Sequence, residues 1–203
     1  MTLPNCRLFL VAPASENADL VADCFAAAVA AGDVASLLIT DPGEPGQMEQ
    51  TARRLLPLAH AGDTAVLIEN DGKLALSLGA DGLEIDADIK ALKDLRSKLG
   101  TDLAIGVNCG AERHLAMEMA EAGADYVRIS PFAPGPGDEP LIAWWSQLFE
   151  IPSVTEEALT ADEITRAVQL GADFVRPDDA MWVSPQQATD IIAQAMQAIA
   201  AAR

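Results

Sequence analysis

The sequence predicts a single (β/α)₈ barrel over residues 1–203, and three observations support this fold class. Apolar runs typical of buried strands alternate eight times with helical stretches, as in parallel α/β proteins. Glycines stand at most of the joints between a helix and the next strand. Gly-Ala-Asp recurs at three joints, within LGADGLEI (78–85), AGADYVRI (122–129) and LGADFVRP (170–177). An open doubly wound sheet is the alternative, disfavoured by the eight strands and by the lack of a Gly-x-Gly-x-x-Gly loop.

The elements follow from these joints. In each Gly-Ala-Asp the glycine takes the left-handed conformation that ends a helix, and the β-prone residues after it form a strand. Looser copies occur at 31–33, 61–63 and 99–102. The expected strands lie near 8–12, 34–40, 65–69, 82–86, 103–107, 126–130, 151–155 and 173–176. The expected helices lie near 18–31, 47–60, 73–78, 89–98, 111–122, 141–149, 161–170 and 185–201.

Composition limits the function classes. The chain is 50% hydrophobic and 4% aromatic, enough for one core of small aliphatic side chains. The first residues show no signal-peptide pattern and no apolar run approaches the ~20 residues that span a bilayer, so a cytoplasmic protein without membrane partners is expected. A net charge of −18 argues against nucleic-acid partners. The cysteines, Cys6, Cys24 and Cys109, have no pairing or metal-ligand spacing and are expected to be reduced.

Each exact Gly-Ala-Asp joint leads to a strand that carries one charge: Glu84, Arg128 or Arg176. Side chains alternate along a strand, so neighbours such as Leu83 and Phe174 are expected to face the helices while the charges face the barrel interior. Alternate strands contribute to one interior layer, so we predict that the three charges meet there. They form either a structural ion network or a site for an anion such as phosphate.

Polar residues gather at the carboxyl ends of the strands, where such barrels place their chemistry. Asn70 and Asp71, with Asp86 or Asp88, offer oxygen ligands to a cation such as Mg²⁺, although spacing alone favours Asp71 as the cap of the next helix over a metal ligand. Cys109 is a rim thiol without an identifiable basic neighbour. The tryptophans either stack on a flat heterocycle at the mouth or pack against the outer helices; they are Trp144, Trp145 and Trp182.

The run LIENDGKLALSLGADGLEIDAD (67–88) resembles the signature of the thiamine-phosphate synthase family, in which Asn-Asp-Arg precedes a helix and leads to Gly-Ala-Asp-Gly-Val-His-Leu-Gly-Gln and an acidic residue. The segments 105–132 and 151–175 are similar to later blocks of the same family. The resemblance implies a small (β/α)₈ barrel, Mg²⁺, and a reaction that joins a pyrimidine diphosphate to a thiazole phosphate. A thiazole tautomerase is the sister activity.

By this resemblance, Asp71 and, allowing one gap, Asp88 match the two Mg²⁺ ligands. Asn70 matches the asparagine of the motif, and Asn108 stands where the family has serine. Together with Glu84, Arg128 and Arg176 inside the barrel, Asn70 and Asn108 are the predicted residues for a small phosphorylated heterocycle. No catalytic residue is assigned, because His60 and His114 fall on predicted helices.

The chain also departs from the family at its phosphate-binding positions. Leu37, Ile39 and Asp41 stand where the family has Gln-x-Arg-x-Lys, and Gly72 replaces the arginine of Asn-Asp-Arg. The Thr-x-Thr-Lys pattern is replaced within PFAPGPGDEP (131–140), and a Gly-Gly turn is replaced by two glutamates at 156–157.

Three hypotheses follow. The chain is a thiamine-phosphate synthase or acts on a related phosphorylated heterocycle; or it is a degenerate barrel that binds a small molecule or a protein without turnover; or it is another aldolase-like or isomerase barrel. The last would need an inward lysine at a strand end, whereas the lysines near the mouth fall on predicted helices. The alanine-rich last helix either closes the barrel or supports a homodimer.

Overall fold

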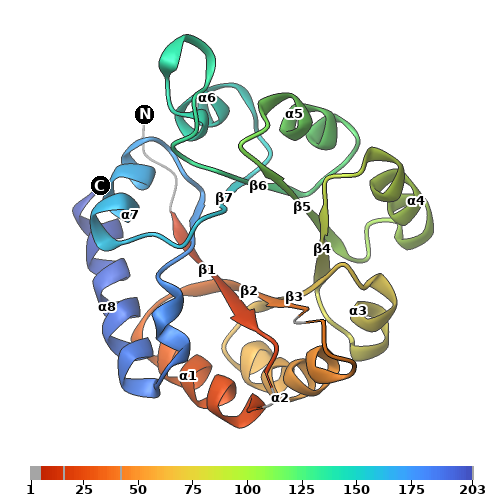
Figure 1. The fold of residues 1–203 in the computed structure, drawn as a ribbon, viewed down its shortest axis with the longest axis vertical. Coiled ribbons are helices and arrows are strands. Elements are labelled where there is room, and N and C mark those ends of the chain that lie inside the picture. The colour runs from red at the N-terminus through yellow and green to blue at the C-terminus, as the bar shows by residue number, and fades with distance from the viewer. Residues whose placement is uncertain (1–5, 16, 42, 203) are drawn as a thin grey trace.

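The structure, a computed structural model, describes residues 6–15, 17–41 and 43–202. Within these residues eight parallel strands pair in chain order and β8 closes onto β1, which makes a closed barrel (Figure 1). The strands are β1 Arg7–Pro13, β2 Val34–Thr40, β3 Ala65–Glu69, β4 Gly82–Asp86, β5 Ala104–Gly110, β6 Tyr126–Ile129, β7 Ser153–Thr155 and β8 Phe174–Val175. The predicted (β/α)₈ barrel is confirmed, and the open-sheet alternative is wrong.

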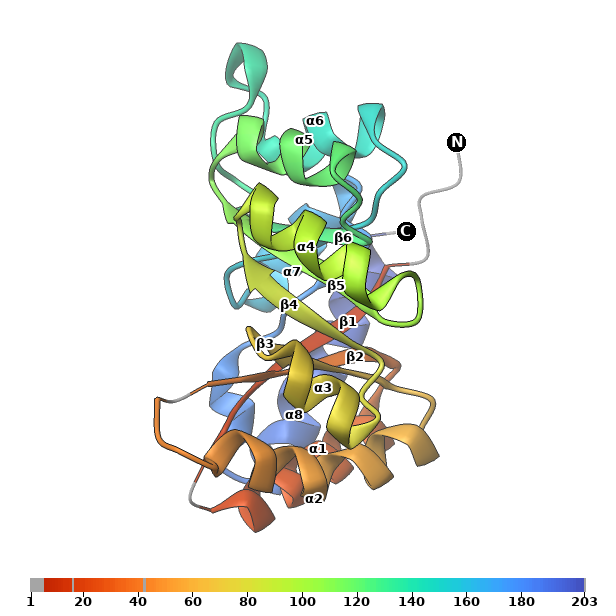
Figure 2. The same ribbon diagram turned by 90° about the vertical axis from the view of Figure 1, so that its right-hand side faces the viewer.

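Helices surround the barrel (Figures 1 and 2). They are α1 Ala18–Ala31, α2 Gln47–Ala61, α3 Gly72–Leu78, α4 Ile89–Leu99, α5 Arg113–Glu121, α6 Leu141–Leu148, α7 Ala161–Gln169 and α8 Pro185–Ala201. Two short 3₁₀ helices, η1 Pro136–Asp138 and η2 Asp179–Trp182, were not expected from the sequence. The last helix, α8, packs against α1 and α7 and completes the helical ring, as one of its two predicted roles required.

The three Gly-Ala-Asp motifs are helix-to-strand joints, as predicted. Gly79, Gly123 and Gly171 have φ angles of +69°, +102° and +98°, a region that side chains with a Cβ rarely adopt. The aspartate of each motif binds the neighbouring strand: Asp81 accepts a hydrogen bond from Val66 N, Asp125 from Ile105 N and Asp173 from Ser153 N, at 2.7, 2.7 and 2.9 Å. The repeat therefore both ends a helix and fixes the start of the preceding strand.

Two apolar clusters stabilise the barrel. The larger lies between the strands and the helices and contains Leu83, Val127 and Val175. The smaller fills the barrel interior: Phe9, Val11, Leu38, Leu67, Tyr126 and Val154, with Ala104 and Phe174 against them. Phe174 therefore faces inward, contrary to the prediction, because β8 alternates with Val175 as its helix-facing residue.

Trp144 and Trp145 pack among the outer helices. Trp145 is fully buried, stacks on Phe149 at 4.0 Å between ring centroids and donates a hydrogen bond to Ile151 O. Trp144 lies 6.5 Å from Trp145 and under the guanidinium of Arg113. Packing is the correct alternative for both tryptophans, and neither is a stacking platform at the mouth.

Candidate functional site

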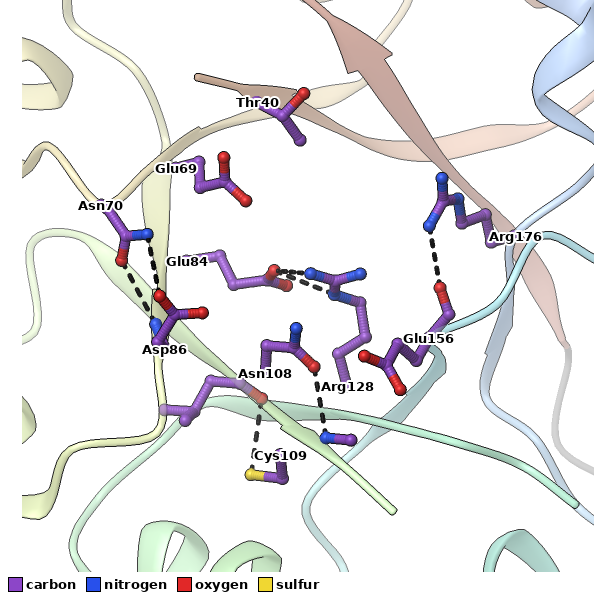
Figure 3. Close-up of polar contacts among 12 residues, drawn as sticks. Thr40, Glu69, Asn70, Glu84, Asp86, Asn108, Cys109, Arg128, Glu156 and Arg176 are labelled. Atoms are coloured by element: carbon purple, nitrogen blue, oxygen red, sulfur yellow. Dashed lines mark hydrogen bonds and ion pairs between the residues drawn. The ribbon is translucent and has the colours of Figure 1, made fainter. Parts of the chain in front are cut away.

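A cavity of about 430 Å³ opens at the carboxyl ends of the strands, at one side of the barrel mouth. Its lining comes from five strands or the turns after them: Val11, Pro13, Thr40, Glu69, Arg128, Arg176, Asp179 and Trp182. The Trp182 indole is held against β1 by a 2.8 Å hydrogen bond to Val11 O. Figure 3 shows Glu69, Glu84, Arg128 and Arg176 directed toward the same central space. The cavity thus combines charged groups of both signs with apolar walls.

Glu84 and Arg128 form an ion pair inside the barrel. Glu84 Oε1 accepts a hydrogen bond from Arg128 Nε at 2.9 Å, and Arg128 Nη2 lies 2.7 Å from the same oxygen in the ion pair. Glu84 Oε2 accepts a hydrogen bond, at 2.9 Å, from the Tyr126 hydroxyl. The two charged residues are only 1% and 7% exposed. The prediction that these charges face inward and pair is confirmed for Glu84 and Arg128.

The hydrogen bonds identify Glu84 as a carboxylate. Burial raises the pKa of the Glu84 carboxyl, while the Arg128 guanidinium and the Tyr126 hydroxyl lower it. Both oxygens face donors, so a proton on either one would displace a hydrogen bond. Desolvation lowers the pKa of Arg128, but Glu84 raises it by more, so the guanidinium stays charged. The pair is an anion and a cation that neutralise each other.

Arg176 does not join this pair, so the predicted three-residue cluster is wrong in that respect. Its Nη1 donates to Glu156 O at 2.9 Å, and its Nη2 forms an ion pair with Asp179. The physical reason is the length of β8, which ends at Val175, so the chain has left the barrel wall at Arg176. Arg176 lines the cavity from the rim instead of the interior.

The asparagines predicted to bind substrate already make hydrogen bonds within the protein. Asn70 adopts a left-handed φ of +52°; its Oδ1 accepts from Asp86 N at 3.2 Å and its Nδ2 donates to Asp86 Oδ2 at 3.4 Å. Asn108 Oδ1 accepts from Gly110 N at 3.2 Å. Neither lines the mouth cavity. A role for Asn70 or Asn108 in substrate binding stays a prediction.

Asp71 and Asp88, the predicted metal ligands, cap α3 and α4. Asp71 Oδ1 accepts from Lys73 N and Leu74 N, and Asp88 Oδ1 accepts from Lys90 N and Ala91 N. Among the described residues, no group of three or more His, Cys, Asp or Glu side chains is placed to hold a metal ion. Mg²⁺ commonly needs only one or two carboxylates with water and phosphate, and Oδ2 of each aspartate is not used by its cap. Mg²⁺ ligation by the pair stays a prediction.

On β2, Leu37 and Ile39 belong to the cluster between strands and helices, whereas Leu38 belongs to the interior cluster and Thr40 lines the cavity. The inward side chains at this end of β2 are therefore uncharged. Asp41, directly after the strand, donates its N–H to Glu69 Oε2 at 2.8 Å and so orients that carboxylate.

The loops after β7 and β8, which often bind phosphate in barrels of this class, carry carboxylates in this chain. Glu163 accepts from Thr160 N and Oγ1 in a capping box at the start of α7. Asp178 accepts from Ala180 N at the start of η2. Glu156, in place of a glycine turn, accepts a 2.7 Å hydrogen bond from the Ser130 hydroxyl. Two backbone donors of these loops, Thr160 N and Ala180 N, therefore already bind carboxylates of the protein itself.

Cys109, near the end of β5, is buried. Burial, with smaller contributions from Glu84 and Glu156, raises the pKa of the Cys109 thiol to about 12. All three cysteines are buried and free of disulfides, as predicted.

The raised pKa of Cys109 predicts a loss of stability in alkali. Between pH 9 and 12 the unfolded chain releases this proton while the folded chain keeps it, so unfolding becomes more favourable as the pH rises. The free energy of unfolding is expected to fall, through this thiol, by about 1.4 kcal/mol per pH unit in that range. Urea denaturation from pH 8 to 10.5 should show a steeper decline for the native chain than for Cys109→Ala. Parallel declines would contradict the prediction.

Tyr126 and Glu69 are the site residues that the sequence reasoning did not assign. The Tyr126 ring crosses the interior because Gly106, its register partner on β5, has no side chain: a Cβ there would lie 1.9 Å from Tyr126 Cζ. Glu69 raises the pKa of Glu84 through charge repulsion, so it lies close to the buried pair. A glycine within a predicted strand was the available signal for a close approach.

The fold and the mouth cavity define a small (β/α)₈ barrel with its candidate small-molecule site at the carboxyl ends of the strands. The family model described as thiamine monophosphate synthase matches residues 8–176. The chain therefore belongs to the thiamine-phosphate synthase family.

Individual proteins agree with this assignment. The chain is 32% identical to a thiamine-phosphate synthase of Rhodospirillum centenum over 90% of this chain and 92% of that protein. It is 38% identical to one of Erythrobacter litoralis over 68% of both chains. The solved thiamine phosphate pyrophosphorylase of Pyrococcus furiosus superposes with a TM-score of 0.79 at 14% identity, covering 98% and 97% of the two chains. No helix in the described part of the chain is both long and apolar enough to cross a membrane.

Proposed function

We propose that this member of the family binds a small, non-phosphorylated molecule in the mouth cavity and does not join two phosphorylated substrates. The observation that carries the proposal is that both arginines of the cavity are already neutralised: Arg128 by Glu84 and Arg176 by Asp179. Glu69 adds a further carboxylate to the lining. The local charge is therefore negative, which opposes a diphosphate.

The energetic consequence is large. A charge-assisted hydrogen bond to a phosphate contributes roughly 1.5–3 kcal/mol. The inward residues near the end of β2, Leu38 and Thr40, are uncharged, and the turn after β7 presents Glu156. Several such contacts are lost together, so binding of a diphosphate and the reaction rate should fall by many powers of ten.

Thiamine-phosphate synthase activity is the second candidate, favoured by the curated relatives that carry this name and by the Asn70–Asp71 pair at the motif position. In this case Asp71 and Asp88 would hold Mg²⁺ through the carboxylate oxygens that their helix caps leave available. The metal would supply positive charge to a bound diphosphate. Arg128 and Arg176 would have to exchange their present partners for that anion.

The two candidates are separated by a direct assay for thiamine phosphate. Hydroxymethylpyrimidine diphosphate, thiazole phosphate and Mg²⁺ are incubated with this chain, and product is measured by mass spectrometry. The Rhodospirillum centenum relative, named thiamine-phosphate synthase, serves as the positive control. We expect no product from the folded native chain. Product that disappears in Asp71→Asn, a variant that keeps a capping side chain, would overturn the proposal and establish the second candidate.

Binding is tested with matched pairs of probes. Hydroxymethylpyrimidine is compared with its diphosphate, and hydroxyethylthiazole with its phosphate, using the Trp182 indole N–H signal in NMR as the reporter in the cavity. The unphosphorylated member of at least one pair is expected to bind more tightly. Tighter binding of both phosphorylated members would contradict the proposal.

A further inference from the structure

We infer that Glu84 determines the charge of the ligand that the mouth cavity accepts. By neutralising Arg128, it excludes anions and leaves one guanidinium nitrogen of Arg128 as a donor to an uncharged acceptor. This inference deepens the proposed function and rests on it. Glu84 does not line the cavity. It acts through Arg128 and is a specificity-determining residue, not a catalytic one.

The first step is the geometry of the pair. Arg128 Nε donates to Glu84 Oε1, and Nη2 lies 2.7 Å from the same oxygen in the ion pair. The Tyr126 hydroxyl donates to the other oxygen of the carboxylate. Because Glu84 is 1% exposed, water screens this attraction very little. An incoming anion would therefore compete with a fixed internal carboxylate for Arg128.

The second step concerns what Arg128 still offers. Arg128 lines the cavity, and among the described residues its Nη1 has no hydrogen-bond partner. Figure 3 shows this nitrogen on the side of the guanidinium away from Glu84. Nη1 can donate to a carbonyl or ring-nitrogen acceptor without requiring that the acceptor be charged.

The third step concerns Glu69, on the wall of the cavity that faces Arg128. Glu69 Oε2 is fixed by Asp41 N at 2.8 Å, which leaves Oε1 as an acceptor toward the cavity. A carboxylate there repels anions and attracts N–H or ammonium donors. The combination selects an uncharged or positively charged molecule that presents an acceptor to Arg128 and a donor to Glu69.

The inference is tested by giving the cavity a net positive charge. Glu84→Gln retains the size of the side chain and its acceptor oxygen but removes the charge that neutralises Arg128. Inorganic phosphate is titrated into the native chain and Glu84→Gln, with the Trp182 indole N–H signal as the readout. We expect at least about tenfold tighter phosphate binding in Glu84→Gln, as the removal of a nearby unit charge predicts.

Two matched variants control for non-specific effects. Glu44→Gln removes one charge from an exposed residue of the loop after β2 and should leave phosphate affinity within about twofold of native, since exposed charges are well screened. Glu84→Asp keeps the charge and should also show no gain. Adding Arg128→Gln to Glu84→Gln should abolish the gain. Unchanged phosphate affinity in folded Glu84→Gln, or a gain that survives Arg128→Gln, would overturn the inference.

The native chain provides a test that does not depend on Glu84→Gln folding. Phosphate is expected to bind it with a dissociation constant far above about 1 mM. Tighter binding that is lost in Arg128→Gln would show that Arg128 is an open anion ligand and would overturn the inference. Failure of the proposed function has a different signature, namely thiamine phosphate formed by the native chain.

Discussion

Arg128→Met is expected to lower the free energy of unfolding by about 3–5 kcal/mol at pH 8, the usual cost of removing one partner from a buried ion pair. The substitution keeps an elongated side chain but leaves the Glu84 carboxylate with only the Tyr126 hydroxyl as a partner. Burial already raises the pKa of Glu84, and loss of Arg128 removes an opposing influence. Urea denaturation of native and variant chains measures the difference.

The sign of the pH dependence follows from this raised pKa. In Arg128→Met the folded chain keeps the Glu84 proton at a pH at which the unfolded chain has released it. The stability of the variant is therefore greatest at low pH and is lost as the pH rises from about 4.5 through the raised folded pKa. The deficit relative to native should be clearly smaller at pH 5 than at pH 8.

The double variant Glu84→Met with Arg128→Met is the matched control. Replacing both members of a buried pair by apolar residues is often neutral or stabilising, so most of the lost stability should return. A double variant as unstable as Arg128→Met at pH 8 would assign the loss to packing and contradict an unpaired buried charge as its cause.

Gly106→Ala is expected to cost about 3 kcal/mol of stability, at the upper end of ordinary overpacking. Its Cβ would lie 1.9, 2.2 and 2.3 Å from Cζ, Cε1 and the hydroxyl oxygen of Tyr126, so the ring must move. Movement of the ring also breaks the hydrogen bond to Glu84 and disturbs the pair with Arg128. Thermal and urea denaturation both report this loss.

Gly62→Ala is the control for the loss of glycine flexibility itself. At Gly62 the φ angle is −101° and the nearest atoms to an added Cβ lie at 3.6 Å, so alanine fits. Its stability should stay within about 0.5 kcal/mol of native, as for other unstrained surface substitutions. Equal effects of the two substitutions would contradict the steric explanation for Gly106.

Most of the fold was predictable because its signals are local. The strands at 34–40, 65–69 and 82–86 and the helices at 18–31 and 185–201 have the predicted bounds. The errors in the predicted bounds lie where contacts with neighbouring segments decide where a strand begins or ends. The predicted strand at 151–155 is reduced to Ser153–Thr155, and β5 extends to Gly110, beside a register shift against β6.

The candidate site was predicted less completely. Alternation along β4 and β6 placed Glu84 and Arg128 in the interior, and their pairing follows from charge. The same reasoning failed for Arg176, because β8 is two residues long and the alternation ends with the strand. On β2 the residues matched to the family's Gln-x-Arg-x-Lys, Leu37 and Ile39, face the helices, and the inward residues are Leu38 and Thr40. A shift of one residue exchanges the two faces of a strand.

The sequence by itself determined the alternation of strands and helices, the glycine joints between them and the family to which the chain belongs. These properties depend on apolar periodicity, backbone conformation and motif spacing, which are written along the chain. Only the tertiary structure decided that Tyr126 joins the Glu84–Arg128 pair across the interior and that Arg176 pairs with Asp179 at the rim instead. The physical reason is that closure of the barrel brings distant strands within hydrogen-bond reach, while the end of β8 fixes how far inward Arg176 can extend.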